Sequence, residues 1–203
     1  MIIDEIMRIS PVIPVLVLEG DADWQRLAET FVDAGLRVLE ITLRTPTALE
    51  AIRQMSQVPG AIVGAGTVLN ERQLEEAIEA GSQFIVSPGL TEPLARAVQN
   101  SGIAYLPGVA TAGDIMRGLD LGLERFKFFP AEASGGIPAL KALSAPFFEA
   151  RFCPTGGVRP DNAAEWLVLN PVLCVGGTWL YRGPDDNLDE VAERAQAAAS
   201  IAR

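Results

Sequence analysis

Histidine is absent from this chain of 203 residues, and lysine is scarce, with Lys127 and Lys141 as its only two examples. The lack of histidine excludes Ser-His and Cys-His catalysis, imidazole-ligated zinc or iron, and imidazole acid–base chemistry. Proton transfer and nucleophilic attack must therefore use carboxylates, lysine, cysteine, tyrosine or water.

Cysteine is nearly as scarce, since only Cys153 and Cys174 occur and they form no CxxC pair. This pattern predicts no disulfide framework and favours a reducing cytoplasm. No apolar run approaches the roughly 18 residues of a membrane span, and the acidic start of the chain does not resemble a signal peptide. We therefore expect a cytoplasmic protein with no membrane partner.

Positive charge is in deficit, with 16 basic against 26 acidic residues and a net charge of −10. Such a balance argues against nucleic acid or an anionic membrane as a partner. It leaves room for a small anionic ligand, because a pocket can be locally positive. The length suits one domain, residues 1–203, that buries roughly 70% of its unfolded surface.

Short β-branched or apolar runs alternate with longer amphipathic stretches, which predicts parallel βαβ units. The expected strands are residues 12–17, 38–42, 61–65, 84–87, 105–109, 125–129, 152–154 and 172–175. The expected helices are residues 22–34, 47–55, 71–80, 92–100, 114–121, 162–168 and 188–201. Glycines 35, 81, 102 and 122 follow helices where a left-handed cap is favoured.

This alternation predicts an α/β protein with a single (β/α)₈ barrel, near the lower size limit of that fold. The alternative is an open doubly wound sheet. Against it, the turn after the first strand, Val17-Leu18-Glu19-Gly20, is not a G-x-G-x-x-G dinucleotide motif.

Two expected strands carry charges in an apolar setting. If Leu39 and Ile41 face the helices, side-chain alternation turns Glu40 and Thr42 into the barrel, with Arg44 just above them. A buried carboxylate is costly unless it is paired or used. The functional interpretation is a catalytic acid or base; the structural one is an ion pair.

The same alternation in residues 125–129 points Phe126 and Phe128 outward and turns Arg125, Lys127 and Phe129 inward. Removal of water disfavours the ammonium form of a lysine, and a neutral amine can attack a carbonyl to form an imine. The structural alternative is a lysine paired with an interior carboxylate, with Glu40 as the candidate. Lys141 lies in a helical stretch and is expected on the surface.

Three glycine-rich segments follow strands: Gly64-Ala65-Gly66-Thr67, Pro154-Thr155-Gly156-Gly157 and Val175-Gly176-Gly177-Thr178. Paired glycines let backbone N–H groups converge on an anion, and barrels often bind phosphate after strands seven and eight. Each pair alone is more often a tight turn. The two at these positions predict a phosphate site, with Thr155 and Thr178 as further hydroxyl donors.

The chain resembles the bacterial 2-keto-3-deoxy-6-phosphogluconate aldolases, including the bifunctional 4-hydroxy-2-oxoglutarate aldolases. Glu40-x-Thr42-x-Arg44-Thr45 and Phe126-Lys127-Phe128-Phe129-Pro130-Ala131 are its most specific motifs. The resemblance spans essentially the whole chain in family order. It is carried by residues 39–45, 64–68, 87–89, 105–109, 126–132, 154–158 and 175–179.

The resemblance implies a (β/α)₈ homotrimer that cleaves a 2-keto-3-deoxy sugar acid phosphate to pyruvate and glyceraldehyde 3-phosphate without a metal or cofactor. By position, Lys127 matches the imine-forming lysine and Glu40 the general acid/base. Residues that match pyruvate-contacting positions or the aromatic near the imine are Arg44, Thr67, Pro88 and Phe129. Residues that match the phosphate site are Gly156, Gly157, Gly176, Gly177 and Thr178.

The chain departs from the family pattern at Thr178, where serine is commoner, and at Ala112-Gly113-Asp114, in place of Pro-Ser-Glu. The added methyl group of Thr178 would trim the space for phosphate. The second departure suggests only a different helix start. Neither touches Lys127 or Glu40.

The aldehyde product stays open, because the galactonate-derived isomer differs at one stereocentre and hydroxy-oxoglutarate lacks phosphate. Two other functions also stay open. A deoxyribose-phosphate aldolase or transaldolase type would use an aldehyde or another ketose, whereas a carboxylate clamp such as Arg44 favours a keto acid. A non-catalytic phosphate-binding barrel would keep Lys127 as a structural charge that pyruvate and a reductant leave unmodified.

Overall fold

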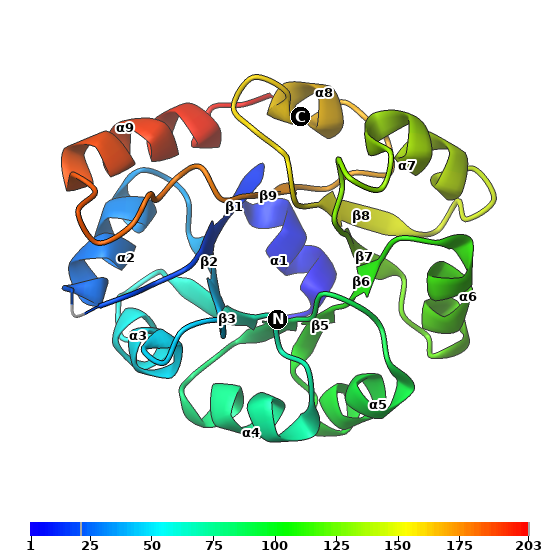
Figure 1. The fold of residues 1–203 in the computed structure, drawn as a ribbon, viewed down its shortest axis with the longest axis horizontal. Helices are drawn as coiled ribbons and strands as arrows, with labels where there is room; N and C mark the ends of the chain where they lie inside the picture. The colour runs from blue at the N-terminus through cyan, green and yellow to red at the C-terminus, as the bar shows by residue number, and fades with distance from the viewer. Residues whose placement is uncertain (21, 203) are drawn as a thin grey trace.

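The computed structural model describes residues 1–20 and 22–202. Helices form an outer layer around an inner layer of strands, and α2 to α9 follow one another around the rim in chain order (Figure 1). The helices are α1 Ile3–Ile9, α2 Trp24–Asp33, α3 Ala48–Met55, α4 Glu71–Glu79, α5 Glu92–Ser101, α6 Ala112–Asp120, α7 Gly136–Ser144, α8 Ala163–Leu167 and α9 Leu188–Ala199.

All strand pairs are parallel, in a six-stranded sheet of order β5-β4-β3-β2-β1-β9 and a three-stranded sheet of order β6-β7-β8. The strands are β1 Val12–Leu16, β2 Val38–Thr42, β3 Ile62–Gly66, β4 Phe84–Val86, β5 Ala104–Leu106, β6 Gly108–Val109, β7 Arg125–Phe128, β8 Arg151–Pro154 and β9 Val175–Gly177. The sheet curls into a half-barrel, with α9 packed against α2.

Hydrogen-bonded strand pairing is interrupted at two places around the curl. Pro107 separates β5 from β6, and only the isolated bridges Phe152↔Val172 and Thr155↔Gly176 connect the β8 region to the segment of β9. The expected α/β fold with parallel strands is therefore present, whereas an unbroken eight-stranded ring is not.

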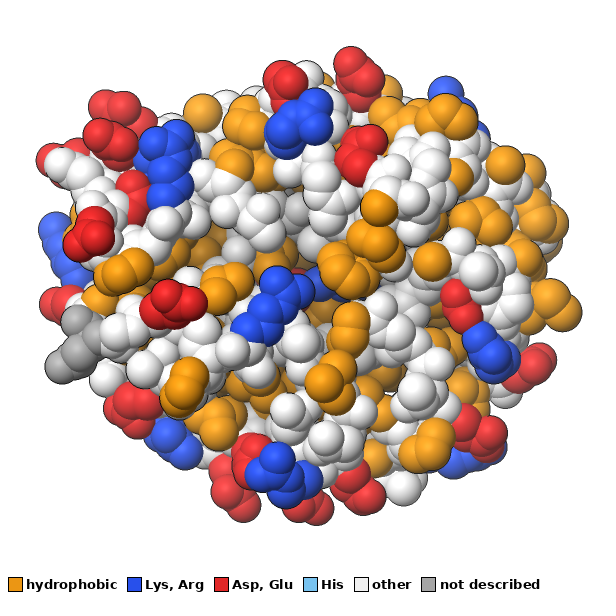
Figure 2. All heavy atoms as spheres, in the orientation of Figure 1, with side chains coloured by type: hydrophobic (Ala, Val, Ile, Leu, Met, Phe, Trp, Pro, Cys, Tyr) orange, Lys and Arg blue, Asp and Glu red, His pale blue; other side chains and the backbone are white. Residues whose placement is uncertain are grey.

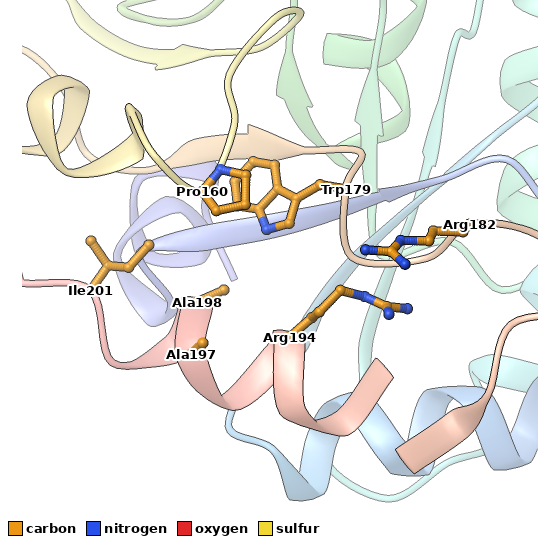
Figure 3. Close-up of a pocket in the computed structure, with 7 residues that line it drawn as sticks. All are labelled: Pro160, Trp179, Arg182, Arg194, Ala197, Ala198 and Ile201. Atoms are coloured by element: carbon orange, nitrogen blue, oxygen red, sulfur yellow. The ribbon is translucent and has the colours of Figure 1, made fainter. Parts of the chain in front are cut away.

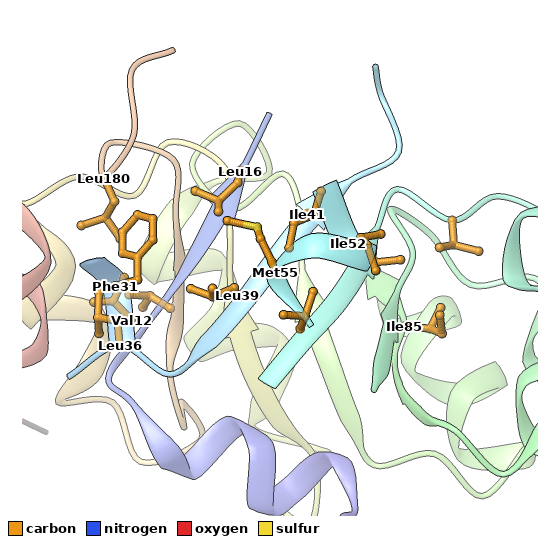
Figure 4. Close-up of a cluster of buried hydrophobic side chains, with 14 of the residues drawn as sticks. Val12, Leu16, Phe31, Leu36, Leu39, Ile41, Ile52, Met55, Ile85 and Leu180 are labelled. Carbon is orange, nitrogen blue, oxygen red and sulfur yellow. The ribbon is translucent and has the colours of Figure 1, made fainter. Parts of the chain in front are cut away.

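Two clusters of buried apolar side chains occupy the two faces of the curled sheet. The larger lies between strands and helices and includes Leu39, Ile41, Phe126 and Phe128 (Figure 4 shows part of it). The alternation expected for β2 and β7 is thus confirmed, because these residues face the helices and leave the intervening Glu40 and Lys127 for the interior.

The smaller cluster is on the inner face and includes Ile6 and Met7 of α1. Asp4 of α1 also forms a salt bridge with Arg125, at the start of β7. Helix α1 was not expected from the sequence, because an apolar contact with the sheet interior and an ion pair far along the chain hold it in place. Helix α7 was expected only in part, as the stretch around Lys141.

Most other elements match their expected bounds within one to three residues, and the four glycines after helices all have the expected positive φ. The last strand differs most from its expected bounds, residues 172–175. Strand β9 begins at Val175 and contains Gly176 and Gly177, which were expected to lie in a loop. Residues 172–174 contribute only a bridge at Val172. Within the described residues, no helix is long and apolar enough to cross a membrane.

Candidate active site

Lys127 and Glu40 meet in the interior of the curled sheet. The Lys127 Nζ atom donates a hydrogen bond to Glu40 Oε1 at 2.9 Å, and the two residues are only 5% and 3% exposed. Such a pair is stable only because each charge satisfies the other, and removal of one partner typically costs about 3–5 kcal/mol. The geometry alone fits both a structural ion pair and a nucleophile beside its acid/base.

Gly66, the last residue of β3, leaves the space that the Glu40 carboxylate fills. A Cβ atom at position 66 would lie 2.3 Å from Glu40 Oε1 and 2.7 Å from its Cγ. The backbone of Gly66 has no positive φ, so the residue is required here for space rather than for conformation. Any larger side chain would push Glu40 away from Lys127. The sequence shows this glycine, but only the neighbouring strand reveals why it is needed.

Phe129 and Arg44 follow the ends of β7 and β2. Lys127 Nζ lies 5.4 Å from the centroid of the Phe129 ring, within cation–π range. Arg44 is exposed, and no acidic side chain among residues 1–20 and 22–202 forms a salt bridge with it. An arginine without a protein counter-ion at this end of the sheet is suited to hold a carboxylate in a bidentate fork.

Thr67 follows β3 directly and has a φ of 59°, in the left-handed region. A β-branched residue is strained there, at a typical cost of about 1–3 kcal/mol, and such strain concentrates at functional sites. Gly66 pairs in register with Thr42 of β2, so Thr67 and Arg44 leave the sheet at the same end. This backbone conformation was not predicted from the sequence.

The turn that carries Pro88 is held by a buried hydroxyl pair that the sequence did not reveal. Ser87 Oγ donates to the Gly89 carbonyl at 2.7 Å and lies 2.8 Å from the Tyr105 hydroxyl, which must therefore be the donor to Ser87. Burial raises the pKa of Tyr105 to about 12, so this donor stays protonated. A Cβ atom at position 108 would lie 2.1 Å from the Pro88 carbonyl oxygen, so only glycine fits beside this turn.

The two glycine pairs expected to bind phosphate have different conformations. Gly156 and Gly157 lie in the loop after β8 with φ of 94° and 83°, whereas Gly176 and Gly177 are extended residues of β9. The sequence interpretation of the second pair as a loop is wrong. A Cβ at Gly176 would lie 2.2 Å from Thr155 Oγ1, and one at Gly177 would lie 2.6 Å from the Trp179 ring, so both glycines make room for side chains.

Thr155 and Thr178 nonetheless lie next to these pairs. Thr155 is buried and bridges to Gly176, while Thr178 is exposed directly after β9. The structure thus brings the loops after β8 and β9 side by side, as the expected phosphate site requires. Figure 2 shows basic side chains near the centre of the viewed face and most acidic side chains nearer its rim, despite the net charge of −10.

In the described part of the chain, no group of three or more Cys, Asp or Glu side chains is placed to hold a metal ion. Lys141 is exposed on α7, as expected, and takes no part in the cluster around Lys127 and Glu40.

Known proteins resemble this chain over its full length. The family model described as KDPG and KHG aldolase matches residues 3–194. The 2-dehydro-3-deoxy-phosphogluconate aldolase of Zymomonas mobilis is 53% identical over 201 residues, which cover 99% of this chain and 97% of that protein.

Two of the solved structures that resemble this chain belong to the same family as its sequence relatives. A 2-keto-3-deoxy-6-phosphogluconate aldolase of Z. mobilis superimposes with a TM-score of 0.98 at 52% identity, covering 100% of this chain and 98% of that one. The KDPG aldolase of Legionella pneumophila, with pyruvate captured as a covalent carbinolamine, gives 0.91 at 42% identity and covers 97% and 98%. The chain belongs to the KDPG and KHG aldolase family.

Proposed function

We propose that this protein is a class I aldolase that cleaves 2-keto-3-deoxy-6-phosphogluconate to pyruvate and glyceraldehyde 3-phosphate, with Lys127 as the nucleophile. The observation that carries the assignment is the buried hydrogen bond between Lys127 Nζ and Glu40, in a chain of this family. An imine mechanism needs an amine shielded from water with a proton acceptor in contact, and this pair supplies both.

The reaction begins with proton transfer from Lys127 Nζ to Glu40, over the 2.9 Å that separates them. The neutral amine attacks the C2 ketone to give a carbinolamine. Glu40 then donates a proton to the departing hydroxyl, and loss of water leaves a protonated imine. The carbinolamine captured with pyruvate in the L. pneumophila relative supports this sequence of steps.

The protonated imine acts as an electron sink for carbon–carbon cleavage. Glu40 accepts the C4 hydroxyl proton, directly or through a bound water, while the C3–C4 bond breaks. C4 leaves as the aldehyde and the bonding electrons form an enamine on C3. Glu40 returns its proton to C3, and water then hydrolyses the pyruvate imine to release pyruvate and free Lys127.

The other site residues bind the two ends of the substrate. Arg44 holds the keto-acid carboxylate in a charge-assisted fork, and Thr67, Pro88 and Phe129 surround the three carbons that become pyruvate. The phosphate lies between the loop after β8 and the C-terminal end of β9. Its contacts are Thr155, Gly156, Gly157, Gly176, Gly177 and Thr178.

We further infer that the half-barrel closes into a single (β/α)₈ domain. Two contacts support closure: the bridge between Thr155 and Gly176 joins the β8 region to β9, and the packing of α9 against α2 joins the end of the chain to its beginning. A cytoplasmic homotrimer remains our expectation for the assembly and location of the protein.

The activity is tested by following pyruvate release from three substrates: the gluconate-derived phosphate, its galactonate isomer, and 4-hydroxy-2-oxoglutarate. We expect the highest kcat/KM for the gluconate-derived phosphate and lower values for the other two. A preference for the galactonate isomer would reassign the substrate. Turnover of none of them would contradict the aldolase assignment and favour a non-catalytic phosphate-binding barrel.

A further inference from the structure

The residues proposed to bind the phosphate offer hydroxyl and backbone N–H groups, and none of these six residues carries a positive charge. A phosphate monoester carries a charge of about −1.5 to −2 near neutral pH, and proteins commonly match it with arginine. A basic side chain next to Thr178 would therefore complete the site. A basic residue in this position is present in the described part of the chain.

That residue is Arg182, in the segment after β9. It lines an open cavity of about 260 Å³ together with Thr178, Glu19 and Val15. Val15 belongs to β1 and pairs in register with Glu40, so the cavity adjoins the strand next to the one that carries the proposed acid/base. A volume slightly below that of a typical ligand pocket suits one end of a substrate rather than the whole molecule.

The Arg182 guanidinium has no acidic partner among residues 1–20 and 22–202. Its backbone N–H donates to Asp186 Oδ2 at 2.7 Å, which fixes the segment. The same carboxylate binds the Arg194 guanidinium, so Arg194 neutralises Asp186, and no salt bridge within the described residues compensates the Arg182 side chain. Figure 3 shows the two arginines at one end of a neighbouring apolar pocket, beyond Trp179.

Glu19 and Tyr181 are the other polar groups that line the 260 Å³ cavity. The Glu19 carboxylate would repel a phosphate, and it forms no salt bridge with Arg182 in the described part of the chain. An anion in this cavity is therefore favoured on the side of Thr178 and Arg182.

We propose that Arg182 is a specificity-determining residue that binds the phosphate of the substrate together with Thr178. This inference rests on the proposed aldolase function, because it assigns a role at the same site. Its consequence is selective: Arg182 contributes to the binding of phosphorylated substrates and contributes nothing to 4-hydroxy-2-oxoglutarate or to pyruvate, which lack the phosphate.

The test compares Arg182→Ala with the wild type on both kinds of substrate. We expect the KM for the gluconate-derived phosphate to rise about 10- to 100-fold, the loss typical of a hydrogen bond between charged groups, with kcat within about threefold. The kcat/KM for 4-hydroxy-2-oxoglutarate and the yield of borohydride-trapped pyruvate adduct should stay at wild-type values. The KM of Arg182→Lys for the gluconate-derived phosphate should be intermediate, since lysine keeps the positive charge but cannot form two parallel hydrogen bonds to the phosphate.

Arg72→Ala is the matched control, because it removes an equal charge from an exposed position on α4. An unchanged KM for the phosphorylated substrate in Arg182→Ala would overturn the inference, as would an equal loss on both substrates or an equal effect of Arg72→Ala. If wild-type protein forms no pyruvate adduct and cleaves no substrate, the aldolase function itself fails. The two failures are therefore distinct.

Discussion

Substitution of Lys127 by alanine should abolish aldol cleavage, with kcat at least about 10⁴-fold lower, because the covalent route through the imine is lost. The remaining rate would come from binding and positioning alone. Pyruvate release from the gluconate-derived phosphate measures the effect. The variant also leaves the buried Glu40 carboxylate without its partner, so a drop in stability is expected alongside the loss of activity.

Two further variants separate chemistry from folding. Lys127→Arg keeps a cation that can bind Glu40, yet a guanidinium stays protonated and does not form the imine, so this variant should fold and remain inactive. Lys141→Ala removes the other lysine, which is exposed on α7, and should retain wild-type activity. Substantial turnover by folded Lys127→Arg protein, or inactivity of Lys141→Ala, would refute the assignment of the nucleophile.

Replacing Glu40 by glutamine should lower kcat by about 10² to 10⁴-fold, the usual contribution of a general acid or base. Glutamine fills nearly the same space beside Gly66, and its side-chain oxygen can still accept a hydrogen bond from Lys127. It cannot carry a proton between the C4 hydroxyl and C3. The rate of carbon–carbon cleavage should therefore fall more than the rate of imine formation. Single-turnover measurements of both steps would show the difference.

Glu50→Gln provides the control for this substitution, since it removes the same charge from an exposed position on α3 and should leave both steps unchanged. If imine formation and cleavage were slowed equally in Glu40→Gln, Glu40 would matter as much for forming the imine as for breaking the C3–C4 bond. The proposed division of roles would then be wrong.

The sequence predicted the interior of the site because strand alternation is a local rule. Leu39 and Ile41 face the helices, so Glu40 is turned inward, and the same argument on β7 turns Lys127 toward it. The strand order of a curled parallel sheet then brings β2 and β7 within reach of one another. Strand geometry alone does not decide whether the buried Lys127–Glu40 pair is catalytic or structural. The catalytic interpretation came from the resemblance of the motifs to the aldolase family.

Features that depend on contacts between residues far apart in the chain could not be predicted from the sequence. Helix α1 depends on its burial against the inner face of the sheet, and β9 contains glycines because Thr155 and Trp179 occupy the space of their missing side chains. The left-handed Thr67 and the Tyr105–Ser87 pair likewise depend on neighbouring strands. Arg182 becomes a candidate phosphate ligand only when the structure shows that Arg194 forms the salt bridge with Asp186.

Reductive trapping tests most directly whether Lys127 forms an imine with a keto acid. Native protein is treated with pyruvate and borohydride, and the modified peptide is identified by mass spectrometry. We expect one reduced pyruvate adduct, on Lys127, and none when pyruvate is omitted. An adduct on Lys141, or an unmodified folded protein, would contradict the role of Lys127 as the nucleophile.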